Sequence, residues 1–77
     1  MEFVNRTEQD ITVVSIRGQR MDAAAAPQFK GHMVDLIQQG GTRFVLNLEA
    51  VDFMDSSGLA SLMSSMNTLG GHGEMVV

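Results

Sequence analysis

An almost unbroken apolar run at residues 43–48, RFVLNL, constrains the fold more than any other feature of the chain. A run of this kind lacks the polar alternation of a half-exposed strand and is typical of a strand covered on both faces inside a sheet. We therefore expect the middle of the chain to form an inner strand of an α/β fold.

Segments with the spacing of amphipathic helices lie on both sides of this run. The first begins near Pro27, which suits a first turn, and ends at the glycines of residues 40–41. The second follows a loop at residues 55–58 and ends at residues 70–71. The apolar stripes predicted to pack in the core consist of Phe29, Met33, Leu36 and Ile37 in the first helix and of Leu59, Leu62, Met63, Met66 and Leu69 in the second.

Two β-rich segments precede the first helix. Residues 3–7 and 11–17 are separated by a polar turn at residues 8–10, which predicts an antiparallel hairpin. Residues 74–77 begin a further strand. The order is β-β-α-β-α-β, so we expect one α/β domain over residues 1–77, with a mixed sheet, an N-terminal hairpin and right-handed crossover helices.

Composition excludes several classes of function. The 77 residues carry a net charge of −4, and the basic residues are scattered: Arg6, Arg17, Arg20, Lys30 and Arg43. Nucleic-acid binding needs clustered basic residues, and an anionic membrane surface needs the same, so neither partner is expected. No apolar run approaches the roughly 20 residues of a membrane span, and no signal peptide is visible, so a cytoplasmic location is expected.

Cofactor and metal sites are not expected either. The chain has no cysteine, and His32 and His72 stand alone, so we expect no metal centre and place both histidines at the surface. A serine hydrolase would need Ser56 in a Gly-x-Ser-x-Gly turn, and that pattern is absent. Asn47, in an otherwise apolar strand, is expected to anchor a loop.

The sequence Asp-Ser-Ser-Gly at residues 55–58 places two hydroxyl groups where the second helix begins. A helix N-terminus carries unpaired N–H groups and about half a positive charge, so it can accept a phosphate. Asp and Ser are also the preferred N-cap residues, and one of them is needed merely to start the helix. Both interpretations remain open, and they are compatible.

The run at residues 53–59, FMDSSGL, preceded by LNL at residues 46–48, closely resembles the anti-sigma factor antagonists of the STAS family. Gly18, the pair Met21-Asp22 and residues 71–77 also resemble that family, so the likeness covers nearly the whole chain. It implies a non-enzymatic switch without a cofactor. Ser56 would be phosphorylated by a serine kinase that is itself the anti-sigma factor, only unphosphorylated antagonist would bind that kinase, and a phosphatase would reset it.

The chain departs from the family pattern in three places. Family members continue for about one more helix, strand and helix, so we expect the domain to be incomplete at its C-terminus, with a homodimer as one way to complete the sheet. Residues 64–68 lack the basic and aromatic side chains that antagonists often carry there. One extra residue lies between Gly18 and Asp22.

The predicted partner surface combines the loop, the second helix and Asp22. The small residues Gly58, Ala60, Ser61, Ser64 and Ser65 are expected on the outward face of that helix, where they either let a partner approach closely or simply face solvent. Asp22 either orients the loop of Ser56 or favours the helix start as an acidic residue. The predicted binding residues are Asp22, Asp55, Ser57, Gly58, Ala60 and Ser61.

A second function remains open. The chain could be a STAS scaffold subunit of a lipid-transport, stressosome-like or biofilm-regulating assembly, with structural hydroxyl groups and no phosphoswitch.

Overall fold

The computed structural model describes residues 2–70 and 73–76. In chain order the elements are β1 (Glu2–Glu8), β2 (Ile11–Arg17), β3 (Arg20–Met21), α1 (Ala26–Gln38), β4 (Arg43–Asn47), β5 (Phe53–Met54), α2 (Ser56–Leu69) and β6 (Glu74–Val76). This order contains the predicted β-β-α-β-α-β succession. The short strands β3 and β5 are additions that the sequence patterns did not predict.

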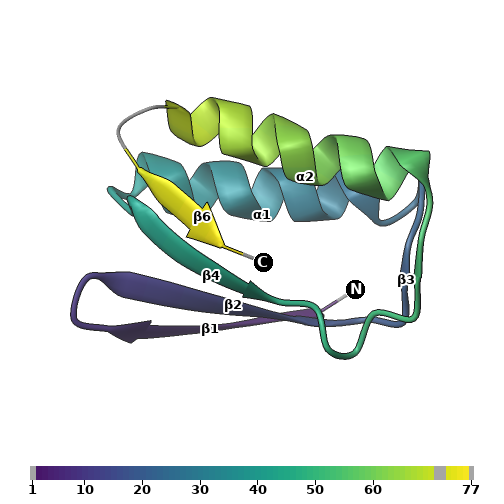
Figure 1. Ribbon diagram of the computed structural model, residues 1–77, viewed down its shortest axis with the longest axis horizontal. Coiled ribbons are helices and arrows are strands. Elements are labelled where there is room, and N and C mark those ends of the chain that lie inside the picture. Colours follow the sequence, from purple (N-terminus) through teal and green to yellow (C-terminus); the bar gives the residue numbers. More distant parts are fainter. Residues whose placement is uncertain (1, 71–72, 77) are drawn as a thin grey trace.

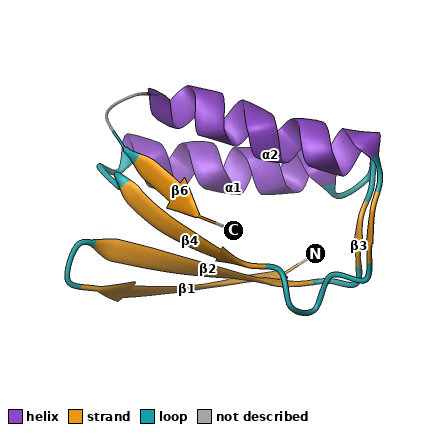
Figure 2. Cartoon of the chain, in the orientation of Figure 1, coloured by secondary structure: helices purple, strands orange, loops and turns teal. Residues whose placement is uncertain are grey.

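The strands form two sheets (Figure 2). The larger has the order β1-β2-β4-β6, in which β1 and β2 form the predicted antiparallel hairpin and the remaining pairs are parallel. The smaller is the parallel pair β3–β5, which stands at one end of the large sheet (Figure 1). The mixed α/β architecture is therefore confirmed.

Both helices lie on the same face of the large sheet (Figure 1). The strand order advances in one direction from β2 to β4 to β6, so two right-handed crossovers place α1 and α2 on one side. The prediction that β4 is covered on both faces is therefore wrong. Phe44 and Leu46 are buried beneath the helices, whereas Val45 faces away from them and keeps 38% of its surface exposed.

The core lies between the helices and the sheet. Large side chains of α1 dominate it, because Phe29 and Met33 are fully buried against Val14 and Ile16 of β2. Met21 of β3 is also fully buried, which ties the short ribbon to the same cluster. The β3–β5 ribbon is thus anchored in the core, and because β3 precedes α1 and β5 precedes α2, it positions the starts of both helices.

Helix α2 is rotated about its axis relative to the predicted orientation, so the prediction is only partly correct. The small residues Gly58, Ser61 and Ser65 are buried, whereas Leu59, Met63 and Met66 are exposed to 50%, 57% and 37%. Small residues allow two helices to approach closely, and α1 and α2 pack side by side. Of the predicted apolar face, only Leu62 and Leu69 enter the core.

Candidate functional site

The β3–β5 ribbon brings the starts of both helices to one end of the molecule (Figure 1). Met21 pairs with Met54 in the parallel register, and the amide of Asp55 donates a hydrogen bond of 3.3 Å to the carbonyl of Met21. Asp22 and Asp55 therefore follow adjacent strand ends, as expected of an α/β sheet edge where sites collect.

Asp55 is the N-cap of α2. Its backbone is extended, with φ −94° and ψ −173°, and its side chain accepts a hydrogen bond of 3.0 Å from the amide of Gly58. Its carbonyl accepts the amide of Leu59 at 3.0 Å. The capping interpretation of the Asp-Ser-Ser-Gly motif is confirmed for Asp55, so neither serine is needed to cap the helix.

Ser56 is the first residue of α2, and it is exposed. Ser57 is half-buried beside α1. The first amides of a helix have no partner within it, so the Ser56 hydroxyl stands next to N–H groups at the positive end of the helix dipole. The structure therefore leaves one freely accessible hydroxyl at this helix start.

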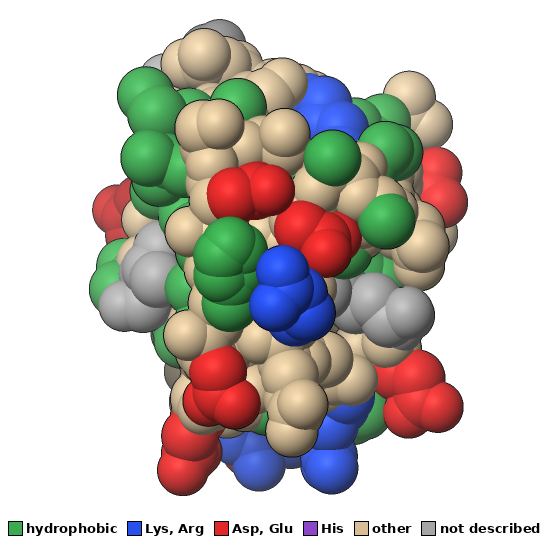
Figure 3. All heavy atoms as spheres, turned by 90° about the vertical axis from the view of Figure 1, so that its right-hand side faces the viewer, with side chains coloured by type: hydrophobic (Ala, Val, Ile, Leu, Met, Phe, Trp, Pro, Cys, Tyr) green, Lys and Arg blue, Asp and Glu red, His purple; other side chains and the backbone are tan. Residues whose placement is uncertain are grey.

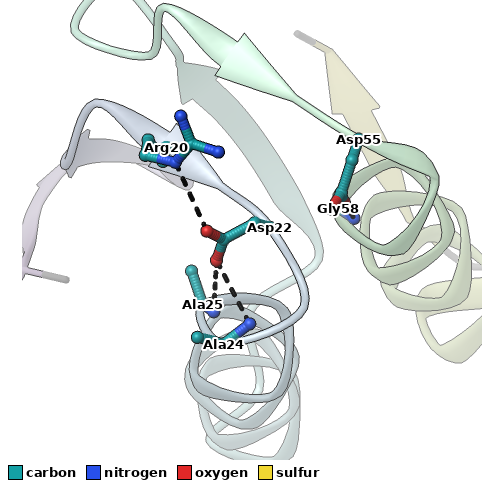
Figure 4. Close-up of polar contacts among 6 residues, drawn as sticks. All are labelled: Arg20, Asp22, Ala24, Ala25, Asp55 and Gly58. Atoms are coloured by element: carbon teal, nitrogen blue, oxygen red, sulfur yellow. Dashed lines mark hydrogen bonds and ion pairs between the residues drawn. The ribbon is translucent and has the colours of Figure 1, made fainter.

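Asp22 organises the turn that leads into α1. Its Oδ1 accepts hydrogen bonds from the amides of Ala24 at 3.1 Å and Ala25 at 3.2 Å, and its Oδ2 lies 3.5 Å from Nε of Arg20 (Figure 4). These contacts, above all the one with the Ala25 amide, lower the pKa of Asp22 below its ordinary value. The interpretation as a helix-start acid is thus supported. Its carboxylate points toward its own turn and not toward Asp55 (Figure 4).

A groove of about 410 Å³ runs between the first turns of α1 and α2. Small side chains line most of it, and the lining residues are Ala23, Ala26, Pro27, Lys30, Ser57, Ala60, Ser61 and Ser64. Lys30 closes one end, because its Nζ donates to the carbonyl of Ser64 at 3.0 Å and to Oγ1 of Thr68 at 2.6 Å. Ser57, which lines the groove, directly follows Ser56 in the chain, so the groove lies beside the exposed Ser56.

A model of the STAS domain family matches residues 2–77 of this chain. The chain belongs to the STAS domain family.

Two solved structures resemble this STAS domain over nearly its whole length. The unphosphorylated form of the anti-sigma factor antagonist SpoIIAA aligns with a TM-score of 0.74 at 27% sequence identity, covering 96% of this chain and 69% of SpoIIAA. The phosphorylated form of SpoIIAA, described as a Bacillus cell fate determinant, aligns with a TM-score of 0.76 at 26% identity, covering 99% and 70%. No match is found among curated proteins. The predicted family and fold are confirmed.

Two of the predicted binding residues of this STAS domain do not lie on an outward face. Gly58 is buried, and a Cβ atom there would collide with the carbonyl oxygen of Met21 and lie 2.9 Å from its Cγ. Ser61 keeps only 8% of its surface, and its Oγ donates to the carbonyl of Gly58 at 2.7 Å. The placement of both residues was wrong, because α2 turns its small residues toward the rest of the domain. Ala60 is exposed, as predicted.

Arg20 and Phe53 belong to the same end of the STAS domain, and the sequence patterns did not single them out. The guanidinium carbon of Arg20 lies 4.3 Å from the centre of the Phe53 ring, which is 38% exposed. Figure 3 looks onto this end and shows acidic, basic and hydrophobic side chains gathered together. A two-residue strand carries too little periodicity to be recognised, so only the cross-strand pairing of Arg20 with Phe53 reveals this contact.

Asn47 and His32, which were also singled out from the sequence, have structural roles. Oδ1 of Asn47 accepts the amide of Glu49 at 3.0 Å, which confirms the predicted loop anchor. His32 is not simply a surface residue, since its ring stacks on Phe3 with centres 4.4 Å apart and its Nε2 lies 2.9 Å from Oδ1 of Asn5. His72 lies outside the described residues.

The part of the chain that the structure describes holds neither a candidate metal site nor a helix that could span a membrane. Residues 2–70 and 73–76 contain no group of three or more His, Cys, Asp or Glu side chains that could hold a metal ion. In the same part of the chain, neither helix has the length and apolarity required to cross a membrane.

Proposed function

We propose that this STAS domain is a phosphorylation-controlled, non-enzymatic regulator of the anti-sigma factor antagonist type. In its unphosphorylated form it binds a serine kinase that is itself an anti-sigma factor. Phosphorylation of Ser56 by that kinase ends the complex, and a phosphatase restores it. The observation that carries the proposal is the exposed Ser56 hydroxyl at the start of a helix already capped by Asp55.

The free domain can hold a phosphate on Ser56 at little cost. A phosphoserine adds about −1.5 to −2 charges at neutral pH, and the N-terminal amides and dipole of α2 favour negative charge at that point. Water reaches Ser56 and can hydrate the rest of the dianion. Nothing in α2 itself adds to the load, because Ser56–Leu69 contains no charged side chain.

A docked partner would remove that hydration. The groove between α1 and α2 offers an apolar floor, made by Ala26, Pro27 and Ala60, directly beside the serine. A partner side chain placed there would cover Ser56, and a buried, unpaired dianion would then cost several kcal/mol. The switch therefore operates through charge and desolvation, and it needs no change of fold.

The comparison with SpoIIAA supports this direction. That antagonist is described in both a phosphorylated and an unphosphorylated form, and each aligns with this chain at a similar TM-score. We carry the phosphoswitch over to Ser56 as a proposal.

The proposal can be tested with the wild type, Ser56→Ala, Ser56→Asp and the neighbouring control Ser57→Ala. A serine kinase of the anti-sigma type with Mg-ATP should modify the wild type and Ser57→Ala at Ser56, and should leave Ser56→Ala unmodified by mass spectrometry. Calorimetry in the absence of ATP should give Ser56→Ala the affinity of the wild type and Ser56→Asp an affinity lower by about a hundredfold or more, roughly 3 kcal/mol. Equal affinities of Ser56→Ala and Ser56→Asp would reject the switch.

Mass spectrometry of protein taken from cells separates this proposal from the scaffold alternative. Modification confined to Ser56 supports the switch. Its absence under every growth condition would favour a STAS scaffold with structural hydroxyl groups.

A further inference from the structure

A second pocket lies at the end of the domain opposite Ser56. It has a volume of about 490 Å³ and opens between the C-terminal end of α1 and the turn of the β1–β2 hairpin, so we call it the hairpin-end pocket. In Figure 1 the hairpin turn is at the left, whereas both helices begin at the right. The 13 residues of α1 separate the two ends by about 20 Å, so this pocket is distinct from the candidate site.

Oxygen-bearing side chains make up most of the lining of the hairpin-end pocket. Asn5 pairs with Val14, and Thr7 pairs with Thr12, in the antiparallel register. Opposite residues share a face of the sheet, so the buried Val14 places Asn5 on the helix side, and the two threonines lie two residues further along the same face. The apolar core therefore gives way to polar side chains toward the hairpin turn. The lining residues with side-chain oxygen atoms are Asn5, Thr7, Asp10, Thr12, Gln39 and Thr42.

Asp10 gives the hairpin-end pocket a negative charge. Among the described residues that line the pocket none is basic, and Asp10 is the one that carries a carboxylate. Arg43 does not line the pocket, but its Nη1 lies 3.1 Å from Oδ2 of Asp10. That hydrogen bond is the main cause that lowers the pKa of Asp10 below its ordinary value of 3.8, so the carboxylate is ionised at neutral pH.

The end of α1 adds to the preference of this pocket for positive charge. The C-terminal end of a helix carries about half a negative charge, and the last turn of α1, all of which is described, has no basic side chain to balance it. The amides of residues 39–41 donate to carbonyls of α1, so they are not free to bind an anion. The hairpin-end pocket therefore offers hydrogen-bond acceptors and negative charge.

We propose that the hairpin-end pocket binds a small aliphatic amine in its protonated form. A primary ammonium group has three N–H donors and no acceptor, so hydroxyl and amide oxygens can satisfy it while one carboxylate balances its charge. A divalent metal fits less well, because residues 2–70 and 73–76 contain no group of three or more His, Cys, Asp or Glu side chains that could hold it. Leu36 also lines the pocket and can contact the methylene groups of the amine. This inference does not depend on the proposed phosphoswitch.

An NMR titration of the isotope-labelled chain with diaminobutane, at neutral pH and constant ionic strength, tests the proposal without any partner or kinase. The amide signals of Thr7, Thr12 and Gly40 should shift and saturate, with a dissociation constant of about 1 mM or lower, whereas the signal of Ser56 should not move. Potassium chloride in place of the amine should leave the same signals unchanged. Magnesium chloride should not produce saturable shifts at these amides.

Three variants locate the binding. Asp10→Asn removes the carboxylate and Thr12→Val removes a hydroxyl group at constant shape, so each should raise the dissociation constant about tenfold. Asp52→Asn is the matched control, because it makes the same change at an exposed residue beside β5, at the other end of the domain, and should leave the constant unchanged.

Circular dichroism should show that the three variants are folded. The proposal would be overturned by a wild type that does not saturate at about ten times the expected dissociation constant, or by either salt reproducing the shifts. An equal loss of affinity in Asp52→Asn and Asp10→Asn, or unchanged affinity in Thr12→Val, would overturn it as well.

Discussion

The two helices begin at the same end of the domain, yet they contribute to it in opposite ways. α1 buries large side chains, with Phe29 and Met33 fully enclosed, whereas α2 buries Gly58 and Ser65 and leaves its methionines outside. α1 therefore supplies much of the core. α2 lies close against α1 and exposes Ser56 at its start, which is why the proposed phosphoswitch is placed on α2.

The helix starts differ in the same sense. The N-cap of α1 is Ala25, which has no side chain for capping, and Asp22 stabilises the preceding turn instead. α2 carries its own cap, Asp55, directly before Ser56. In α2 the cap is Asp55, so the hydroxyl of Ser56 is not needed for capping and is available for modification. In α1 no side chain caps the helix, and the carboxylate of Asp22 is used to hold the preceding turn.

The largest expected effect comes from the glycines of the two helices. Gly58→Ala places a Cβ atom against the carbonyl oxygen of Met21, a backbone atom that cannot give way easily. We expect the free energy of unfolding to fall by about 3 kcal/mol or more, at the upper end for overpacking. Gly31→Ala in α1 meets nothing within 4 Å and should raise it by about 0.5–1 kcal/mol. Urea denaturation of both variants measures the difference, and similar values would contradict the close packing of α2.

A cap substitution should have an intermediate effect. Asp55→Ala removes the acceptor of the Gly58 amide and should lower the free energy of unfolding by about 1 kcal/mol. Asp55→Asn keeps an acceptor oxygen and should cost only a few tenths of a kcal/mol, about as much as exchange among good caps. Thermal unfolding of the two variants at pH 7 provides the check. A loss as large in Asp55→Asn as in Asp55→Ala would mean that charge, and not the hydrogen bond, holds the helix start.

The two helices were not equally predictable from the sequence. The stripe of α1 was predicted correctly, since Phe29 and Met33 are fully buried and Leu36 and Ile37 pack partly buried against the core. The stripe of α2 was not, since Leu59, Met63 and Met66 follow the same spacing and yet lie outside. The deciding interaction is the approach of Gly58 to the carbonyl of Met21, a tertiary contact that helical periodicity does not encode.

The candidate site was likewise predictable from the sequence only in part. The Asp-Ser-Ser-Gly motif identified the helix start and its cap, because capping is local to a few residues. The groove with its closing Lys30, and the contact between Arg20 and Phe53, depend on how separate elements meet. The uncovered face of β4 likewise followed from the direction in which the strands advance, which an apolar run cannot reveal.

His32 in α1 should make the free energy of unfolding depend on pH, with a smaller effect than the substitutions above. α2 has no histidine or charged side chain and should show no such dependence. Burial against β1 lowers the pKa of His32 below its ordinary value of 6.5, and the nearby Asp35 opposes this shift in part. The unfolded chain therefore takes up the proton first as the pH falls. Stability should be full above about pH 7, decline as the pH falls through the unfolded value near 6.5, and level off below the folded pKa. In His32→Phe this decline should disappear, as followed by urea denaturation between pH 7.5 and pH 5 (roughly the range in which histidines titrate).

The smallest expected change in stability comes from Asp22 at the start of α1. Its pH dependence distinguishes the contribution of the charge from that of the hydrogen bonds. The pKa of Asp22 is lowered, first by the Ala25 amide, so its ionised form is favoured in the folded state relative to the ordinary value of 3.8. Its contribution should be full above that value and be lost as the pH falls through the folded pKa. Asp22→Asn keeps an acceptor oxygen and removes only the charge. The difference in stability between the wild type and Asp22→Asn should therefore stay constant from neutral pH down to about 5 and shrink at lower pH, where the wild type becomes neutral as well. A difference that persisted in strong acid would show that geometry, and not ionisation, makes Asp22 suited to this turn.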